Sequence, residues 1–252
     1  MKVLAQKGSA LIVVLVIVMI LTVIGVMAIR SGIVGLAIAT NSQASHIMDQ
    51  NNDGALFKIE NSSNFDEFLL GTGLFGFPKM EANRDKELVI CYRGNMKQFY
   101  QFYHASLVYL EQGENEPKIE DIGGLSRSGF CQVNKNKKDF VSGRAAAMTQ
   151  IAVRISGYAE GENEPFSHYQ IGTDTENGKL DETARLIITT TTVMPTLSTE
   201  DPEIINACMK KLSYISTDVN VETVSECLSK NAVSFKTQVS EYSLGQFIKK
   251  AD

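Results

Sequence analysis

Residues 9–29 read SALIVVLVIVMILTVIGVMAI, and Arg30 is the first charge after Lys7. A helix that spans a bilayer needs about 20 apolar residues, whereas the apolar region of a cleaved secretory signal has at most about 15. The stretch therefore predicts a retained transmembrane helix over 9–29. Because Lys2 and Lys7 precede it without an acidic residue, the positive-inside rule predicts a cytoplasmic N-terminus and export of everything after Arg30. A signal peptide cut shortly after this stretch is the alternative, and it exports the same residues.

The apolar pattern continues beyond Arg30 with wider spacing. From Ile33 to Ile59, apolar or small residues recur at intervals of three and four, which is typical of one face of a helix. We therefore expect one helix over 9–60, about 78 Å long, with a fully apolar first half and an amphipathic second half. The polar residues 61–64 (NSSN) end it.

The middle of the chain favours β-structure. Four runs are rich in β-branched or alternating apolar residues, namely 87–92 (ELVICY), 118–122, 150–158 (QIAVRISGY) and 183–194 (TARLIITTTTVM). The last two predict an antiparallel hairpin with one buried face. Together with the first helix, these runs predict an α+β fold in which residues 61–195 form a β-rich head domain.

An aromatic run between these segments, 96–110 (MKQFYQFYHASLVYL), fits either a helix or a strand. Its periodicity does not choose between them. We interpret it as a stripe that faces the core, with aromatic stacking on a glycan or a single-stranded nucleic acid as the alternative.

The end of the chain, 196–252, predicts a partly helical C-terminal extension. Asp201 is a suitable N-cap residue, and Pro202 suits the first position of a helix because its missing N–H would have no partner there. The pattern over 233–252 assigns no element.

Composition and charge exclude some classes of protein. The 252 residues are 44% hydrophobic, which excludes a disordered chain. There are 24 Lys and Arg against 29 Asp and Glu, for a formal net charge of -5, and the basic residues are not clustered. Nucleic-acid binders concentrate positive charge, so we expect no direct nucleic-acid partner.

The four cysteines are candidates for disulfide bonds because export places them in an oxidising compartment. They allow three pairings, and sequence proximity favours Cys91 with Cys131 and Cys208 with Cys227. Each loop closure would contribute about 3 to 4 kcal/mol to stability. A zinc site is the alternative, but the sequence has no CxxC pair.

A calcium-loop pattern lies where the first helix is expected to continue. Asp49, Asn51, Asp53 and Glu60 have the spacing of EF-hand ligands, and Gly54 stands at the sharp turn of such a loop. An EF-hand also needs a helix after the loop, which residues 61–64 do not favour. The two interpretations exclude each other, and we favour the continuous helix without a metal or cofactor.

Catalytic motifs do not appear in the sequence. It contains no Walker loop, HExxH, GxSxG or kinase-like set. We therefore expect that the protein is not an enzyme. A signal-anchored periplasmic enzyme on an unrecognised fold is the alternative, beside a calcium-binding module.

Residues 8–60 resemble the PilX family of type IV minor pilins. A short basic leader ends in Lys7-Gly8, the apolar helix follows at once, and 40–60 (TNSQASHIMDQNNDGALFKIE) is similar to the polar continuation of the family's first helix. A weaker resemblance lies in AVRISGYAEG and ARLIITTTTV, which look like the family's closing sheet strands. The resemblance implies a type IV pilin-like fold, with the helix packed on an antiparallel sheet.

The resemblance also implies processing. Residues 1–8 would be a leader peptide that a prepilin peptidase removes between Gly8 and Ser9, with methylation of the new amino terminus. Most pilins have a glutamate at the fifth mature position, which pairs with a neighbouring subunit's amino terminus; here that position is Val13. Without this pair, a place at the filament tip is implied. Gly25 and Arg30 are implied in packing of the first helices during assembly.

The implied partners follow from the same resemblance. They are other minor pilins, the major pilin, the prepilin peptidase and a tip adhesin of the PilY family. The protein would wait in the inner membrane as a single-pass subunit, prime assembly of a type IV pilus, and thereby support adhesion, twitching or DNA uptake.

Overall fold

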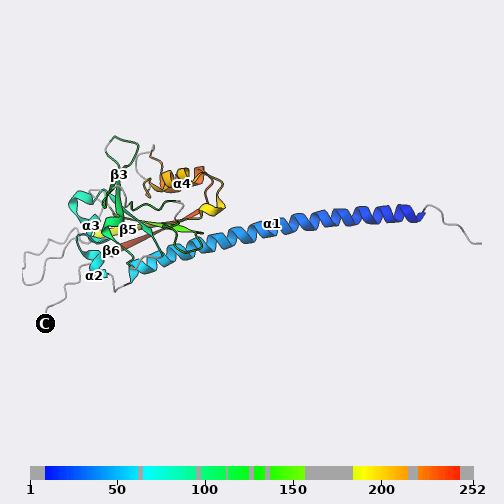
Figure 1. Cartoon of the computed structure of the whole chain (residues 1–252), viewed down its shortest axis with the longest axis horizontal. Helices are drawn as coiled ribbons and strands as arrows, with labels where there is room; N and C mark the ends of the chain where they lie inside the picture. The colour runs from blue at the N-terminus through cyan, green and yellow to red at the C-terminus, as the bar shows by residue number, and fades with distance from the viewer. Residues whose placement is uncertain are drawn as a thin grey trace, which may run out of the picture. The chain divides into compact units, whose positions relative to one another are not determined.

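The first helix has the bounds that the sequence predicts. In the computed structural model, α1 runs without interruption from Ser9 to Glu60, over 52 residues (Figure 1). The structure describes residues 9–61, 65–94, 98–111, 113–124, 128–133, 137–156, 184–214 and 221–244. The expected leader, 1–8, lies outside them. The chain divides into two compact units, 1–46 and 47–252, so the last turns of α1 belong to the head unit.

Two threonine hydroxyls in the exposed part of α1 bond to the backbone of the preceding turn. Thr22 Oγ1 donates to the carbonyl oxygen of Met19 at 2.8 Å, and Thr40 Oγ1 donates to that of Leu36 at 2.9 Å. Because each hydroxyl has a backbone acceptor in the preceding turn, it can lie in an apolar environment without an unpaired donor.

The described strands of the head unit form one antiparallel sheet. Its order is β3-β2-β1-β4-β5-β6. The strands are β1 (Glu87–Tyr92), β2 (Ala105–Tyr109), β3 (Lys118–Asp121), β4 (Met148–Ile155), β5 (Ala184–Val193) and β6 (Phe235–Leu244). The expected hairpin strands, β4 and β5, pair in antiparallel register with Ile151 opposite Thr190. Residues 157–183, which connect them, lie outside the described part of the chain. Together, the long helix and the sheet give an α+β layout.

Short helices surround the sheet. They are α2 (Phe65–Leu69), α3 (Gly76–Lys79), α4 (Pro202–Met209) and α5 (Val224–Lys230), with 3-10 turns η2 (Glu81–Asn83), η3 (Phe102–His104) and η4 (Pro195–Leu197). As expected, α4 begins at Pro202, and the Asp201 side chain accepts a hydrogen bond from the Glu203 backbone N–H. A capping box starts α5, in which Thr223 and Glu226 exchange side-chain-to-backbone hydrogen bonds.

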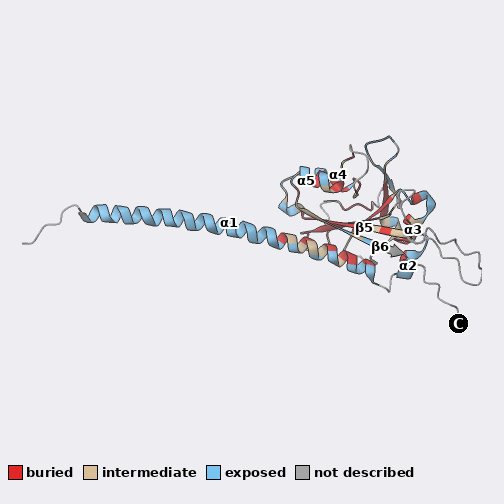
Figure 2. Cartoon of the chain, turned by 180° about the vertical axis from the view of Figure 1, so that it is seen from behind, coloured by how far each residue is buried: buried red, intermediate tan, exposed pale blue. Residues whose placement is uncertain are grey.

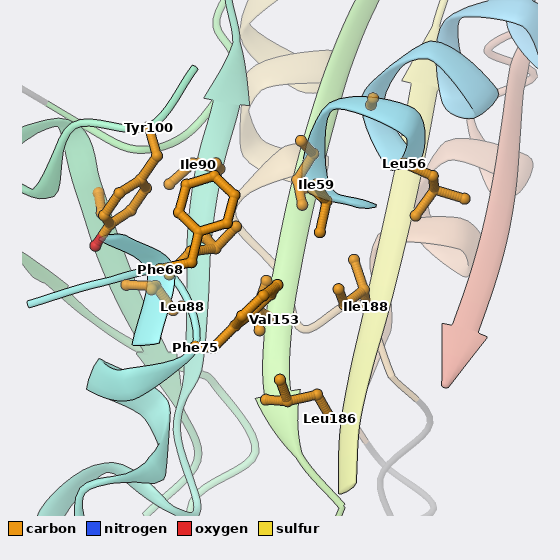
Figure 3. Close-up of a cluster of buried hydrophobic side chains, with 14 of the residues drawn as sticks. Leu56, Ile59, Phe68, Phe75, Leu88, Ile90, Tyr100, Val153, Leu186 and Ile188 are labelled. Carbon is orange, nitrogen blue, oxygen red and sulfur yellow. The ribbon is translucent and has the colours of Figure 1, made fainter. Parts of the chain in front are cut away.

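One face of the sheet packs against the last turns of α1. Leu56 and Ile59 lie over Val153 of β4 and Ile188 of β5, within a core that includes Leu88, Ile90, Ile151 and Leu186 (Figure 3). Full burial of one such side chain contributes about 1.5 to 3 kcal/mol. Figure 2 shows the change along α1, which is exposed in its first part and has buried residues in its last turns.

The opposite face carries a second core beneath α4 and α5. Ile205 and Met209 of α4 pack with Val224 and Leu228 of α5 against Met148 of the sheet. Burial of both faces explains the continuous apolar and threonine-rich character of the central strands, because neither face is left to water.

The C-terminal segment completes the sheet. All ten residues of β6 pair with β5, from Phe235 opposite Val193 to Leu244 opposite Ala184. The head therefore extends past residue 195, the predicted end of the β-rich head domain, and the segment after 195 supplies both an edge strand and the helices of one face.

Candidate functional site

The apolar segment of α1 is the first candidate site. Its side chains are exposed around the whole circumference, with Val13 53%, Val14 58% and Leu15 61% accessible. In the described part of the chain, α1 is the one helix long and apolar enough to cross a membrane. A helix that is apolar on every side needs a lipid or protein environment. The segment therefore fits a membrane anchor or signal.

The residues implied in assembly, Val13, Gly25 and Arg30, lie along this helix, as do two further glycines, Gly32 and Gly35. A Cβ placed on Gly25, Gly32 or Gly35 would meet no other atom within 4 Å. Since α-helical residues seven apart lie on nearly the same face, Gly25 and Gly32 share a side of α1, with Gly35 close by. Arg30 is exposed and follows the apolar stretch. Ser9 is the first residue of α1, and Gly8 lies outside the described residues.

A buried polar network fixes the last turns of α1 to the sheet. Asn52, which is 0% exposed, accepts a hydrogen bond from Thr192 Oγ1 at 2.6 Å and donates to the carbonyl oxygen of Lys236 at 3.1 Å. Thr192 Oγ1 lies 2.8 Å from Thr149 Oγ1 on the next strand. The network joins α1 to three strands, and the directional bonds fix one register of helix on sheet.

The candidate calcium ligands belong to the same helical turns. Asp49 and Glu60 are eleven residues apart, which places them about 16 Å apart along a helix, too far to share one ion. Each contacts β6 instead: Asp49 accepts from Lys236 Nζ at 2.6 Å, and Glu60 accepts from Tyr242 Oη at 2.6 Å. Asn51 Nδ2 donates to the carbonyl oxygen of Ile47. Asp53 lies on the same helix, so the calcium-loop pattern folds as helix rather than as a loop.

The four cysteines form two disulfides in the head unit. Cys91 of β1 is bonded to Cys131, and Cys208 of α4 is bonded to Cys227 of α5, with Cα–Cα distances of 4.8 and 5.4 Å. These are the pairs that sequence proximity favours. Their thiols are therefore not zinc ligands. All four are buried in the second core.

A buried carboxylate beneath the second face was missed by sequence reasoning. Glu87 is 1% exposed and accepts hydrogen bonds from the backbone N–H of Ser213, at 3.0 Å, and from its hydroxyl. Arg154 is nearby and stacks on the Tyr214 ring, 4.1 Å from its centroid. Burial raises the pKa of Glu87, and the Ser213 hydrogen bonds and the Arg154 charge oppose that rise.

The aromatic run 96–110 divides between the core and the surface. Tyr100 is buried, its hydroxyl donates to the carbonyl oxygen of Thr72 at 2.9 Å, and burial raises its pKa. Residues 105–109 form strand β2, so this part of the run, which fitted either a helix or a strand, is a strand. Tyr103 is 62% exposed, and Phe99 is partly buried. The core-facing interpretation therefore describes only part of the run.

Comparison with known proteins identifies no relative: no family model, no curated protein and no solved structure matches this chain.

Proposed function

We propose that this chain is a minor pilin, of the PilX-like kind, that primes assembly of a type IV pilus at or near its tip. The observation that carries the proposal is the composition of α1. A single helix begins with an exposed apolar segment and ends with turns that form one side of the core of an antiparallel sheet domain. A subunit built this way can be stored in a membrane by the first part and can present the head outside it.

The charge pattern supports the orientation. Lys2 and Lys7 stand on the cytoplasmic side of the apolar segment, so the head lies in the periplasm of a single-pass inner-membrane protein. Removal of residues 1–8 by a prepilin peptidase leaves Ser9, the first residue of α1, as the amino terminus. The disulfides of the head suit an oxidising compartment.

Assembly then moves the apolar segment from lipid into the filament core. Neighbouring first helices supply the apolar surroundings that lipid supplied before. Gly25, Gly32 and Gly35 permit close approach of a neighbouring backbone, because nothing within the chain itself occupies the space beside them. The partners are other minor pilins, the major pilin and a tip adhesin of the PilY family.

Val13 supports a place at the tip. A buried carboxylate at this position is tolerable only if a neighbour's amino terminus pairs with it. Valine at position 13 avoids the cost of burying a carboxylate, and it cannot form the ion pair with a neighbour's amino terminus. The subunit therefore fits a position that has no further subunit to pair with through this residue.

The test is the mass and N-terminal sequence of the protein recovered from its native membranes. We expect a chain that begins at N-methylated Ser9. In a matched variant, Gly8→Val, a branched side chain obstructs the extended backbone that a protease must bind, so the leader should remain. An intact Met1 in the unmodified protein, in cells that process their other prepilins, would overturn the proposal.

A further inference from the structure

A pocket of about 320 Å³ lies in the head unit beside the end of α1. It is bounded by α2, by the end of β1 and by residues 98–100. Six side chains define its character: Lys58, Glu67, Tyr92, Arg93, Gln98 and Phe99. The volume is at the lower end of the range for small-molecule sites, which suits a ligand of one or two rings.

An aromatic wall forms one side of the pocket. The rings of Tyr92 and Phe99 are both half-buried, and their centroids are 5.5 Å apart. Phe68, which is buried and also lines the pocket, has its ring centroid 6.1 Å from that of Phe99 and 6.2 Å from that of Tyr100. Figure 3 shows Phe68 and Tyr100 together at the edge of the core. The wall is thus supported from within, so its shape does not depend on a ligand.

The backbone at the end of β1 is held close to a second loop. A Cβ on Gly94 would lie 1.8 Å from the carbonyl oxygen of Val141, so only glycine permits this approach. Arg93 Nε donates to Asp139 Oδ1 at 2.6 Å in the same region. The guanidinium is therefore fixed at the pocket by an ion pair that is itself mostly buried.

The polar side of the pocket has both donors and acceptors, and its charges balance once Asp139, the buried partner of Arg93, is counted. Lys58 and Arg93 are matched by Glu67 at the rim and Asp139 behind Arg93. Lys58, Glu67 and Gln98 are exposed, so they can turn toward a ligand. A balanced set of this kind does not select a phosphate or a polyanion, which needs an excess of positive charge. It suits a neutral ligand whose groups both donate and accept hydrogen bonds.

We propose that this pocket binds a pyranose sugar. A sugar ring has an apolar C–H face, which fits the wall of Tyr92 and Phe99, and a rim of hydroxyls, which fits Gln98, Glu67 and Lys58. A single sugar ring in a pocket of this size should bind with a dissociation constant of about 1 mM. The inference does not depend on the proposed place in a pilus.

The experiment is saturation-transfer NMR on the full-length chain in a detergent without a sugar head group. The probes are the methyl pyranosides of glucose, galactose and mannose, together with N-acetylglucosamine, at about 10 mM. We expect transfer to the ring protons of at least one probe. Phe99→Ala should weaken binding about five- to tenfold, and Gln98→Ala about threefold.

The control is Tyr103→Ala. Tyr103 is an exposed aromatic residue of the same run that does not line the pocket, so its removal should leave binding unchanged. Gln98 is exposed, and its variant keeps the test valid even if Phe99→Ala unfolds the head. The proposal is overturned if no probe receives saturation, or if Gln98→Ala and Tyr103→Ala bind the sugar equally well. Leader processing is measured separately, so this result is independent of the proposed function.

Discussion

Asn52 of α1 accepts a hydrogen bond from Thr192 of β5, with 2.6 Å between Oδ1 and Oγ1, across 140 residues of sequence. Neither residue is exposed to solvent. The bond is buried between α1 and the sheet, where a lost partner leaves the other group without water to replace it. It therefore contributes to the register of the helix on the sheet as well as to stability.

The first prediction concerns this bond. Asn52→Ala removes the acceptor of the Thr192 hydroxyl and a donor to the Lys236 carbonyl, and should lower the free energy of unfolding of the head by about 2 to 4 kcal/mol. Urea unfolding of the detergent-solubilised chain measures the change. Asp53→Ala, at the exposed neighbouring position, is the control and should have an effect within about 0.5 kcal/mol. Equal effects of the two variants would contradict the assigned role of Asn52.

The second prediction concerns Glu87 and pH. Because burial raises its folded-state pKa above the ordinary value of 4.5, the native state binds more protons than the unfolded state between these two values. The unfolding free energy should therefore fall as pH rises from 4.5 through the raised pKa. Above that pKa, Glu87 is ionised in both states and the loss of stability is complete. Glu87→Gln keeps an acceptor for Ser213 and should flatten this part of the stability curve.

The matched control for Glu87 is Glu116→Gln. It removes the same charge from an exposed position, so it should leave the slope between stability and pH as it is in the unmodified protein. If both variants have the same pH profile, the slope belongs to other groups and the buried state of Glu87 has no consequence for stability.

The third prediction concerns the disulfides. The bonded residues are 40 positions apart for Cys91–Cys131 and 19 for Cys208–Cys227. The loop-closure relation gives about 4 kcal/mol for the first bond and about 3 kcal/mol for the second. We expect the paired substitutions to Ala to lower the unfolding free energy by about these amounts. Mass spectrometry of non-reduced peptides tests the connectivity, and a peptide that joins Cys131 to Cys208 would disprove it.

Local sequence signals predicted the elements that carry a strong pattern. The helix 9–60 and strand 87–92 match α1 and β1, and Asp201 caps α4 as expected. In each case, the pattern is apolar periodicity or cap chemistry that a few neighbouring residues contain by themselves.

Other elements depend on distant residues. Strand β6 has polar residues on both faces. Lys236 forms an ion pair with Asp49 of α1 on one face, and Thr237 is hydrogen-bonded to Ser225 of α5 on the other. No alternation marks such an edge strand. The partner of Glu87 is 126 residues away, and no local signal could have identified it. The calcium-loop pattern is a local match in the sequence, but its residues form part of the continuous helix α1.

The fourth prediction concerns Gly25. Because a Cβ at this position meets no atom within 4 Å, Gly25→Leu should leave the level and membrane insertion of the single chain unchanged. A larger side chain should nevertheless hold neighbouring first helices apart and reduce the amount of other pilins that co-purify. Val26→Leu, which exchanges one large apolar residue for another, is the control. If the two variants recover the same amount of partner pilins, Gly25 is not at a helix–helix contact.

The last prediction concerns the fifth residue of the mature chain. Val13→Glu restores a carboxylate that can pair with a neighbour's amino terminus, so the variant should be accepted within the shaft as well as at the tip. Immunogold labelling of surface filaments measures this, with label at filament ends for the unmodified protein and along the length for the variant. Val14→Glu adds the same charge about 100° around the helix, where it does not meet that partner, and should reduce assembly instead. Label restricted to filament ends for Val13→Glu, at an unchanged number of filaments, would show that valine at this position does not determine the place of the subunit.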